Sequence, residues 1–167
     1  AAYDRQGVTE ADLVDFTPQI KAAALAAIKD LRIGPMFTTS SLIDAPDGTR
    51  GALVLPHFGG GSNWEGGAAD PETGMLYVAS QTTMNVFAVN PANGRSDIRY
   101  LFVNGDAPRP LGLPLIKPPY GRITAIDMNT GEHRWMVPNG DTPDDIKSNP
   151  ALAGITIGAY TLVSPIG

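Results

Sequence analysis

The chain has 167 residues, and its 12 Lys and Arg against 17 Asp and Glu give a formal net charge of -5 at pH 7. Its basic residues form no cluster, so binding to nucleic acid, which depends on clustered Lys and Arg, is not expected. The absence of Cys excludes disulfide bonds, thiolate zinc sites and cysteine nucleophiles. Gly and Pro make up about a fifth of the chain against an average of roughly 12%, which indicates a turn-rich folded protein. The longest apolar run, residues 22–28, is too short for a membrane span.

One segment near the N-terminus carries the signals of a helix. Thr17 is suited to cap it, Pro18 takes the first helical position, and Gly34 with Pro35 is suited to close it. The residues on its predicted buried face are Ile20, Ala24, Ile28 and Leu31. A shorter helix is predicted over residues 9–16, because the sequence TEAD at 9–12 has the form of a capping box.

Short runs rich in β-branched and aromatic residues follow, and each is bounded by Gly, Pro, Asn or Asp. The strands that they predict are residues 51–55, 64–69, 76–80, 85–89, 98–103, 122–126 and 133–137. Segments 104–120 and 139–150 are predicted loops, because they are rich in Pro, Gly and Asp. The first loop needs cover from other parts of the chain, since it contains the apolar residues Leu111, Leu113, Leu115 and Ile116.

Three connections between the predicted strands share one pattern, in the sequences ADPETG at 69–74, VNPANG at 89–94 and IDMNTG at 126–131. Asp or Asn can accept a hydrogen bond from the backbone two residues on, and Gly tolerates the positive φ that a tight hairpin needs. The pattern therefore predicts antiparallel hairpins. Unrelated hairpins in another all-β fold are an alternative explanation of the same turns.

The third turn extends to AIDMNTGEHRW at 125–135, which resembles the tryptophan-docking motif of quinoprotein dehydrogenase propellers. In that motif the Trp of one blade packs between neighbouring blades. Four further segments resemble the C-terminal part of pyrroloquinoline-quinone (PQQ)-dependent dehydrogenases of the membrane glucose dehydrogenase type. They are YDRQGVTE at 3–10, RIGP at 32–35, GGGSNWEGGAADPETG at 59–74 and KPPYGRITA at 117–125. The resemblance covers residues 3–152, and residues 153–167 match more loosely.

The resemblance implies an eight-bladed β-propeller that holds PQQ and Ca²⁺ on its axis, oxidises sugars or alcohols, and passes electrons to a membrane quinone or cytochrome. It assigns cofactor binding to Asn63 and Trp64, which match the family segment near the carbonyl edge of the quinone. Asn offers a donor and an acceptor, and the glycines before it allow the backbone to approach a flat ring. The alternative is that Trp64 is a core aromatic residue at the start of a strand and that Asn63 forms a turn.

The family's catalytic Asp and Ca²⁺ ligands precede the matching segment, so we assign no catalytic or metal-binding residue to this chain. Asp4, Asp12, Asp15 and Asp44 lie outside those motifs and receive no role. Asp106, Asp141, Asp144 and Asp145 are expected to be solvated carboxylates in loops.

The predicted fold class is all-β with a short N-terminal helix, forming a partial β-propeller of about one to two blades at roughly 40–45 residues each. Residues 1–50 are a helix-containing segment between blades, and residues 51–167 are the partial propeller, with 81–120 as an insertion. Family connectivity builds one blade from strands at 64–69, 76–80, 121–127 and 132–137. The alternative pairs neighbours in order, as a four-stranded meander over 64–103.

These observations predict a segment of a quinoprotein oxidoreductase that carries part of the cofactor pocket but not the catalytic base, and that is inactive alone. Its expected partners are a sugar or alcohol substrate and the remaining blades or further copies of itself. The resemblance places the parent chain in the periplasm, associated with the inner membrane, and Ala1 is expected to be an interior cut or a processed end. The alternatives are a non-enzymatic partial propeller that binds proteins as a scaffold and, less favoured, a carbohydrate-binding module.

Overall fold

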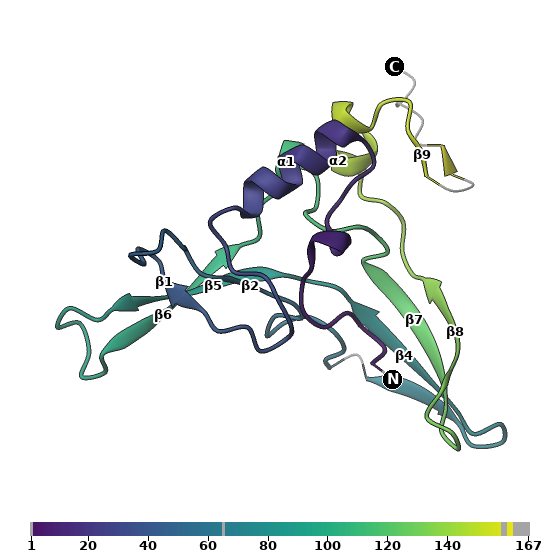
Figure 1. Cartoon of the computed structure of the whole chain (residues 1–167). Coiled ribbons are helices and arrows are strands. Elements are labelled where there is room, and N and C mark those ends of the chain that lie inside the picture. Colours follow the sequence, from purple (N-terminus) through teal and green to yellow (C-terminus); the bar gives the residue numbers. More distant parts are fainter. Residues whose placement is uncertain (1, 65, 158–159, 162–167) are drawn as a thin grey trace. The chain divides into compact units, whose positions relative to one another are not determined.

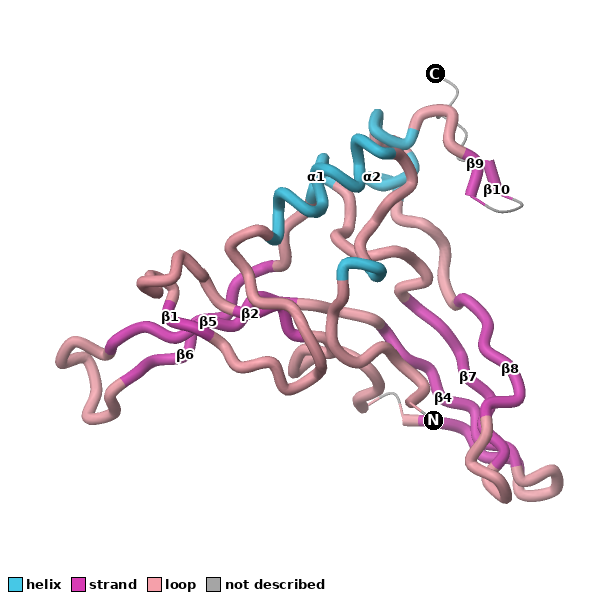
Figure 2. Tube along the Cα trace, in the orientation of Figure 1, coloured by secondary structure: helices cyan, strands magenta, loops and turns pink. Residues whose placement is uncertain are grey.

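A computed structural model describes residues 2–64, 66–157 and 160–161. The chain divides into two compact units. The first contains residues 1–9, 30–107 and 118–140, and the second contains residues 10–29, 108–117 and 141–167. Among the described residues, the helices all belong to the second unit, and the longer strands all belong to the first (Figure 2).

A four-stranded antiparallel sheet is the main element of the first unit. Its strands are β3 (Gly67–Asp70), β4 (Met75–Gln81), β7 (Gly121–Asp127) and β8 (His133–Pro138), and they pair in that order. β4, β7 and β8 lie side by side in Figure 1. The strand order that family connectivity predicts is therefore confirmed, and the sequential meander over 64–103 is wrong. The predicted domain limits stay a prediction.

A second sheet of the same unit is built around β5 (Asn85–Pro91). β6 (Tyr100–Asp106) pairs with one edge of β5. Along the other edge, β2 (Ala52–Val54) is antiparallel to β5 and β1 (Ser41–Leu42) is parallel to it. The β5–β6 hairpin, which lies between β4 and β7 in the sequence, thus pairs with strands that precede the first sheet.

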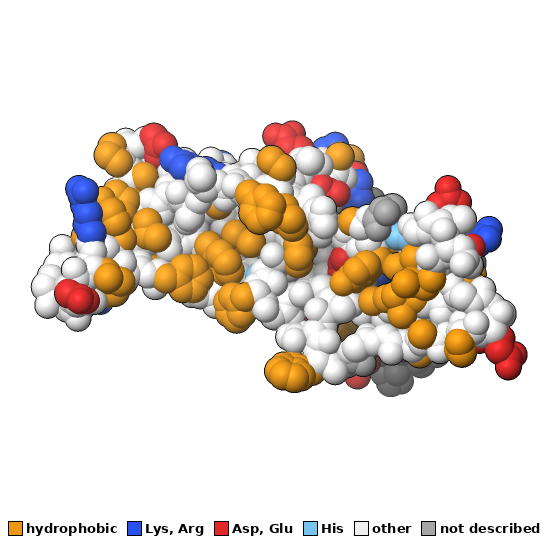
Figure 3. Space-filling view, turned by 90° about the horizontal axis from the view of Figure 1, so that it is seen from below, with side chains coloured by type: hydrophobic (Ala, Val, Ile, Leu, Met, Phe, Trp, Pro, Cys, Tyr) orange, Lys and Arg blue, Asp and Glu red, His pale blue; other side chains and the backbone are white. Residues whose placement is uncertain are grey.

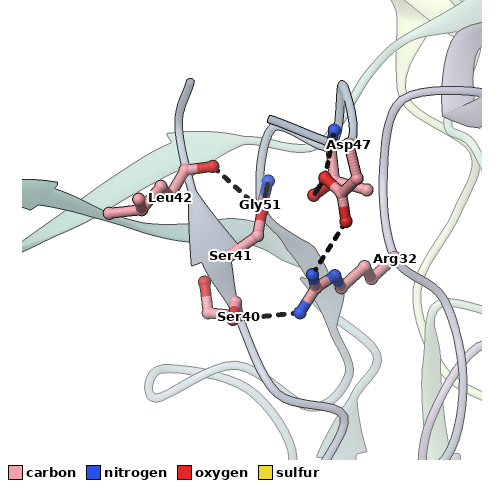
Figure 4. Close-up of polar contacts among 7 residues, drawn as sticks. Arg32, Ser40, Ser41, Leu42, Asp47 and Gly51 are labelled. Carbon is pink, nitrogen blue, oxygen red and sulfur yellow. Dashed lines mark hydrogen bonds and ion pairs between the residues drawn. The ribbon is translucent and has the colours of Figure 1, made fainter. Parts of the chain in front are cut away.

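Polar contacts fix the approach of β1 to β2 (Figure 4). The Gly51 amide, directly before β2, donates a hydrogen bond of 2.7 Å to Ser41 Oγ. Arg32 donates to the Ser40 carbonyl at 3.4 Å and to the Asp47 carboxylate at 3.2 Å. The backbone around these two short strands is therefore held by side chains as well as by the sheet.

The first and third predicted turns are confirmed. The carboxylate of Asp70 accepts a hydrogen bond from the Glu72 amide at 3.0 Å, and that of Asp127 accepts one from the Asn129 amide at 2.8 Å. Gly74 and Gly131 have φ values of 68° and 73°. The side chains at the start of these turns hold the backbone of the loop as the sequence predicts.

The second turn differs from the prediction. Asn90 and Pro91 belong to β5, and the reversal occurs farther along, where the Arg95 amide donates to the Ala92 carbonyl at 3.0 Å. Asn93 and Gly94 both have positive φ, at 51° and 80°, which is the geometry of a type I′ turn. The pairing continues through Pro91 because the fixed φ of proline is compatible with a strand end.

The second unit contains the helix predicted from its cap. α1 spans Pro18–Ile28, the Thr17 hydroxyl accepts from the Ile20 amide at 3.1 Å, and Ile20, Ala24 and Ile28 are buried. The helix ends earlier than predicted. The remaining short elements are η1 (Glu10–Asp12), η2 (Pro110–Gly112), α2 (Asp144–Lys147), η3 (Pro150–Leu152), β9 (Thr156–Ile157) and β10 (Tyr160–Thr161).

The helix predicted over 9–16 is reduced to the 3₁₀ turn η1. Leu13 forms a bridge with Ile116, and the Val14 amide donates to the Leu115 carbonyl at 2.9 Å. This pairing needs an extended backbone, so it ends the helix directly after the capping box. It also buries Leu13 and Val14 in the core of the unit.

The predicted loop at 104–120 is partly covered as expected. Leu113, Leu115 and Ile116 are buried, but Leu111 is 45% exposed and has a φ of 52°. The four carboxylates predicted to be solvated are exposed, namely Asp106, Asp141, Asp144 and Asp145. Their predicted place in loops is wrong for three of them, since Asp106 ends β6 and α2 begins with Asp144 and Asp145.

Candidate functional site

The segment between β2 and β3, residues 55–66, contains the glycine run and both predicted cofactor residues. Gly61 pairs with Gln81 through two backbone hydrogen bonds of 2.8 and 3.1 Å. The His57 amide donates to the Thr83 carbonyl at 3.4 Å, and the Ser62 hydroxyl donates to the Ala79 carbonyl at 2.5 Å. This segment, here called the glycine loop, is therefore held beside the end of β4.

Two of the glycines are required by the geometry of the loop itself. A Cβ atom on Gly60 would lie 2.1 Å from Thr83 Oγ1, so no larger residue fits there without a shift. Gly61 has a φ of 79°, in the left-handed region that favours glycine. The family resemblance explains the glycines by the approach of a flat ring, and the contact with Thr83 is a second reason that only the structure supplies.

His57 folds its ring back onto the loop and was not predicted from the sequence. Its Nδ1 accepts a hydrogen bond from the Gly59 amide at 3.0 Å, and its carbonyl accepts one from the Gly60 amide at 3.0 Å. Partial burial lowers the pKa of His57 from its ordinary value of 6.5, because burial penalises the charged ring. A neutral ring leaves Nδ1 free to accept, so the protonation state of His57 affects the order of the loop.

Asn63 and Trp64 both lie at the surface, and Trp64 is 97% exposed. The Asn63 carbonyl accepts from the Gly66 amide at 3.1 Å, so Asn63 does begin a turn. The interpretation of Trp64 as a core aromatic residue is wrong. Neither side chain has a hydrogen-bond partner among the described residues, and cofactor binding by the two stays a prediction.

Aromatic rings continue from the glycine loop onto the second sheet. Phe58 stacks on Phe87 with ring centres 5.9 Å apart, and Phe87 meets Phe102 edge-on at 4.9 Å. Phe58 is 73% exposed and Phe102 59% exposed. Hydrophobic side chains gather at the surface in the view of Figure 3. The loop thus lies beside an apolar, aromatic surface.

The loop suits one wall of a site for a planar quinone. The exposed indole of Trp64 offers an aromatic face, and the Asn63 amide offers a donor and an acceptor for carbonyl oxygens. The backbone behind them is fixed by its pairing with Gln81. Within the described ranges, no three His, Asp or Glu side chains gather as a metal-binding group.

The tryptophan-docking motif lies on β7 and β8. Trp135 pairs with the fully buried Ala125 across the two strands. Its ring centre lies 5.7 Å from that of Tyr77, and its side chain remains 45% exposed. Arg134 donates to the Asp127 carboxylate at 2.6 Å, beside the turn. The packing of Trp135 between neighbouring blades stays a prediction.

A buried ion pair that was not predicted lies behind the glycine loop, in the same unit. Asp4 Oδ1 is 3.1 Å from Arg122 Nη1, and the two side chains are 8% and 4% exposed. Asp4 received no role from the sequence, although both residues stand in segments that carry the family resemblance. The sequence gives no signal for the pair, because the alternation of β7 groups Arg122 with Thr124 and opposite to the apolar Ile123 and Ala125, which is the pattern of a strand face turned to solvent.

The described residues include no helix of sufficient length and apolar character to cross a membrane.

Comparison with known proteins identifies the family. The model for the PQQ glucose/ethanol/alcohol dehydrogenase β-propeller domain matches residues 1–166. Over an alignment 183 positions long, the chain is 30% identical to a quinate/shikimate dehydrogenase (quinone) of Acinetobacter baylyi, with 97% of this chain and 21% of that protein covered. It is 27% identical over 158 residues to a probable quinate dehydrogenase (quinone) of Xanthomonas campestris pv. juglandis, with 82% and 19% covered.

The chain therefore spans about a fifth of the length of these relatives. Its β3-β4-β7-β8 sheet is antiparallel throughout, as the strands of propeller blades are and as the sequence predicts. The matches support the PQQ-dependent dehydrogenase family as a whole. They do not single out its glucose dehydrogenase type, which the sequence resemblance suggests. The chain belongs to the PQQ-dependent glucose/ethanol/alcohol dehydrogenase family and forms part of its β-propeller domain.

Proposed function

We propose that this chain is a segment of a quinoprotein dehydrogenase that oxidises a hydroxyl group of a sugar or alcohol. Asn63 and Trp64 form one wall of its PQQ pocket, and the catalytic base comes from the rest of the parent protein. The named relatives act on quinate or shikimate, so these compounds stand beside glucose and ethanol as candidate substrates.

The observation that carries the proposal is the exposure of Asn63 and Trp64 on a loop fixed to the sheet by Gly61 and Gln81. The exposed indole of Trp64 offers an aromatic face, and a planar quinone is a partner of matching shape. The Asn63 amide would orient the carbonyl edge of that ring. When bound, PQQ supplies the two-electron acceptor for oxidation of the hydroxyl group.

The remaining parts of the enzyme are also proposals. The missing blades would supply the other walls, the Ca²⁺ ligands and the catalytic Asp. They would also cover Trp135, Met136 and Val137 of β8, which are 42–45% exposed here. A membrane quinone or a cytochrome would accept the electrons, and the reaction would take place in the periplasm.

The experiment is a chimera in which this chain replaces the matching fifth of the Acinetobacter relative. Dye-linked turnover with PQQ and Ca²⁺ is measured on glucose, ethanol, quinate and shikimate, for the chimera and for the chain alone. We expect turnover by the chimera, none by the chain alone, and loss in Asn63→Ala and Trp64→Ala. Phe37→Ala, which removes another exposed aromatic residue, is the control. Turnover by the chain alone would refute the assignment of the base to the missing part.

The exposed surface of β8 also favours a second candidate, a non-enzymatic partial propeller that binds proteins. In that case the purified chain would complete a ring by self-association. Size-exclusion chromatography with mass measurement distinguishes the two candidates, because a segment of an enzyme gains activity from the parent's blades and not from copies of itself.

A further inference from the structure

We propose that Asp4 and Arg122 are positioning residues for the glycine loop and act on it through Thr82. Their part in cofactor binding rests on the proposed function. Their part in ordering the loop does not depend on the cofactor and can be measured without it.

Thr82 forms hydrogen bonds to both members of the buried ion pair. Its hydroxyl donates to Asp4 Oδ1 at 2.8 Å and accepts a hydrogen bond from Arg122 Nη2. The same Nη2 donates to the Pro119 carbonyl at 2.7 Å. A buried ion pair often adds little net stability, because both charges lose their hydration. The contact of the ion pair with Thr82 is therefore more informative about its role than the stability that the pair adds.

Thr82 lies between the two residues that hold the glycine loop. The backbone of Gln81 pairs with Gly61, and the Thr83 carbonyl accepts from the His57 amide. The Thr82 amide donates in the opposite direction, to the Tyr120 carbonyl at 2.6 Å. Residues 81–83 therefore bind the glycine loop along one edge of the backbone. Along the other edge they bind Tyr120, and the side chains of Asp4 and Arg122 hold the Thr82 hydroxyl.

The segment that supplies Asp4 also holds the start of the glycine loop. The Gly7 amide donates to the Leu55 carbonyl at 2.7 Å, and a Cβ on Gly7 would lie 2.5 Å from the Gly34 carbonyl oxygen. This close fit fixes the path of residues 4–7. The loop that presents Asn63 and Trp64 is thus attached to the N-terminal segment at its start and, through Thr82, along its middle.

Three polar side-chain atoms near this attachment are unsatisfied within the described residues. Asp4 Oδ2, Arg122 Nε and Thr83 Oγ1 are buried and lack hydrogen bonds within the described part of the chain. Removal of the Thr82 hydroxyl would leave Asp4 and Arg122 paired but would remove the hydrogen bonds that join their side chains to Thr82. A variant without this hydroxyl therefore tests the positioning role without leaving a buried charge unpaired.

The test is hydrogen exchange of the purified chain without PQQ, measured on backbone amides of residues 57–64 and of β7 and β8. For Thr82→Val we expect exchange of the loop amides, Gly61 above all, to be about three- to tenfold faster, the range for loss of one hydrogen bond. Thr82→Ser keeps the hydroxyl and should restore slow exchange. Asp4→Asn leaves the Arg122 guanidinium buried without its counter-charge, so it should speed exchange in β7 as well as in the loop. Asp47→Asn, which breaks the surface pair with Arg32, should leave the loop unchanged.

The proposal is overturned if loop exchange is unchanged in Thr82→Val, or if β7 and β8 accelerate in that variant as much as the loop does, which would mean general destabilisation. A PQQ titration followed by the NMR signal of the Trp64 indole separates this inference from the proposed function. If PQQ leaves that signal unmoved in the wild-type chain, the cofactor role fails while the exchange result still decides the positioning role.

Discussion

Asp4 and Arg122 come from distant parts of the sequence, yet their side chains form a buried ion pair with atoms 3.1 Å apart. The pair joins the N-terminal segment to β7 and, through Thr82, to the strand end that holds the glycine loop. The candidate cofactor residues Asn63 and Trp64 therefore depend on contacts that a local sequence motif does not contain.

Replacement of Arg122 by Met should lower the free energy of unfolding by roughly 3–5 kcal/mol, because the Asp4 carboxylate would stay buried without its partner. Asp47→Asn breaks an exposed pair and should change the free energy of unfolding far less. Urea unfolding of both variants measures the difference. Equal effects would contradict the burial of the Asp4–Arg122 pair.

Replacement of Gly60 by Ala should destabilise the chain by about 1–3 kcal/mol, since the new Cβ would collide with Thr83 Oγ1. Gly105→Ala is the matched control, because a Cβ there meets only ordinary contacts at 3.8 and 3.9 Å. Adding Thr83→Ala to Gly60→Ala should recover part of the loss. A double variant no more stable than the single one would show that the collision is not the cause.

The glycine loop should become less ordered as the pH falls below about 6.5, the ordinary pKa of His. Burial lowers the pKa of His57 in the folded chain, so the unfolded chain takes up the proton first and folding stability falls in this range. A protonated Nδ1 also cannot accept from the Gly59 amide. Hydrogen exchange of residues 57–64 between pH 7 and pH 5 measures the effect, with the exchange rates corrected for their intrinsic pH dependence. His57→Gln should remove it, and an equal response in that variant would assign the change to another group.

The β7–β8 hairpin should lose stability only in stronger acid. The Asn129 amide and, next, the Arg134 guanidinium lower the pKa of Asp127 below its ordinary value of 3.8. The stabilisation is therefore complete above that value and is lost as the pH falls through the lower folded pKa. Fluorescence of Trp135 on β8 reports the transition, in a Trp64→Phe background. Asp127→Asn should weaken this acid dependence, and an unchanged profile would contradict the role of the carboxylate.

Local signals predicted much of the fold. The Thr17 cap, and the turns at Asp70 and Asp127, depend on neighbours a few residues away and are confirmed. The predicted buried helix face is confirmed at Ile20, Ala24 and Ile28, whereas Leu31 lies beyond the end of α1 and is only half-buried. The pairing of β4 with β7 came from the family resemblance. The shared pattern predicts the second turn too early, and the Asn93-Gly94 pair itself marks the turn that the structure contains.

Contacts between distant segments could not be predicted in the same way. The helix over 9–16 was wrong because Leu13 pairs with Ile116, a residue of a predicted loop. The role of His57 depends on how the loop folds back, and that of Asp4 on where β7 lies. Asn63 and Trp64 were selected by resemblance, and the structure adds their exposure and the attachment of their loop.

The most direct test of the cofactor wall is a titration of the ¹⁵N-labelled chain with PQQ, observed at the indole N–H signals of its two Trp residues. Trp64→Phe and Trp135→Phe assign the two signals. We expect PQQ to shift the Trp64 signal and to leave the Trp135 signal in place, and we expect Asn63→Ala to weaken the shift. A shift confined to Trp135, or no shift of Trp64 at saturating PQQ, would contradict this expectation.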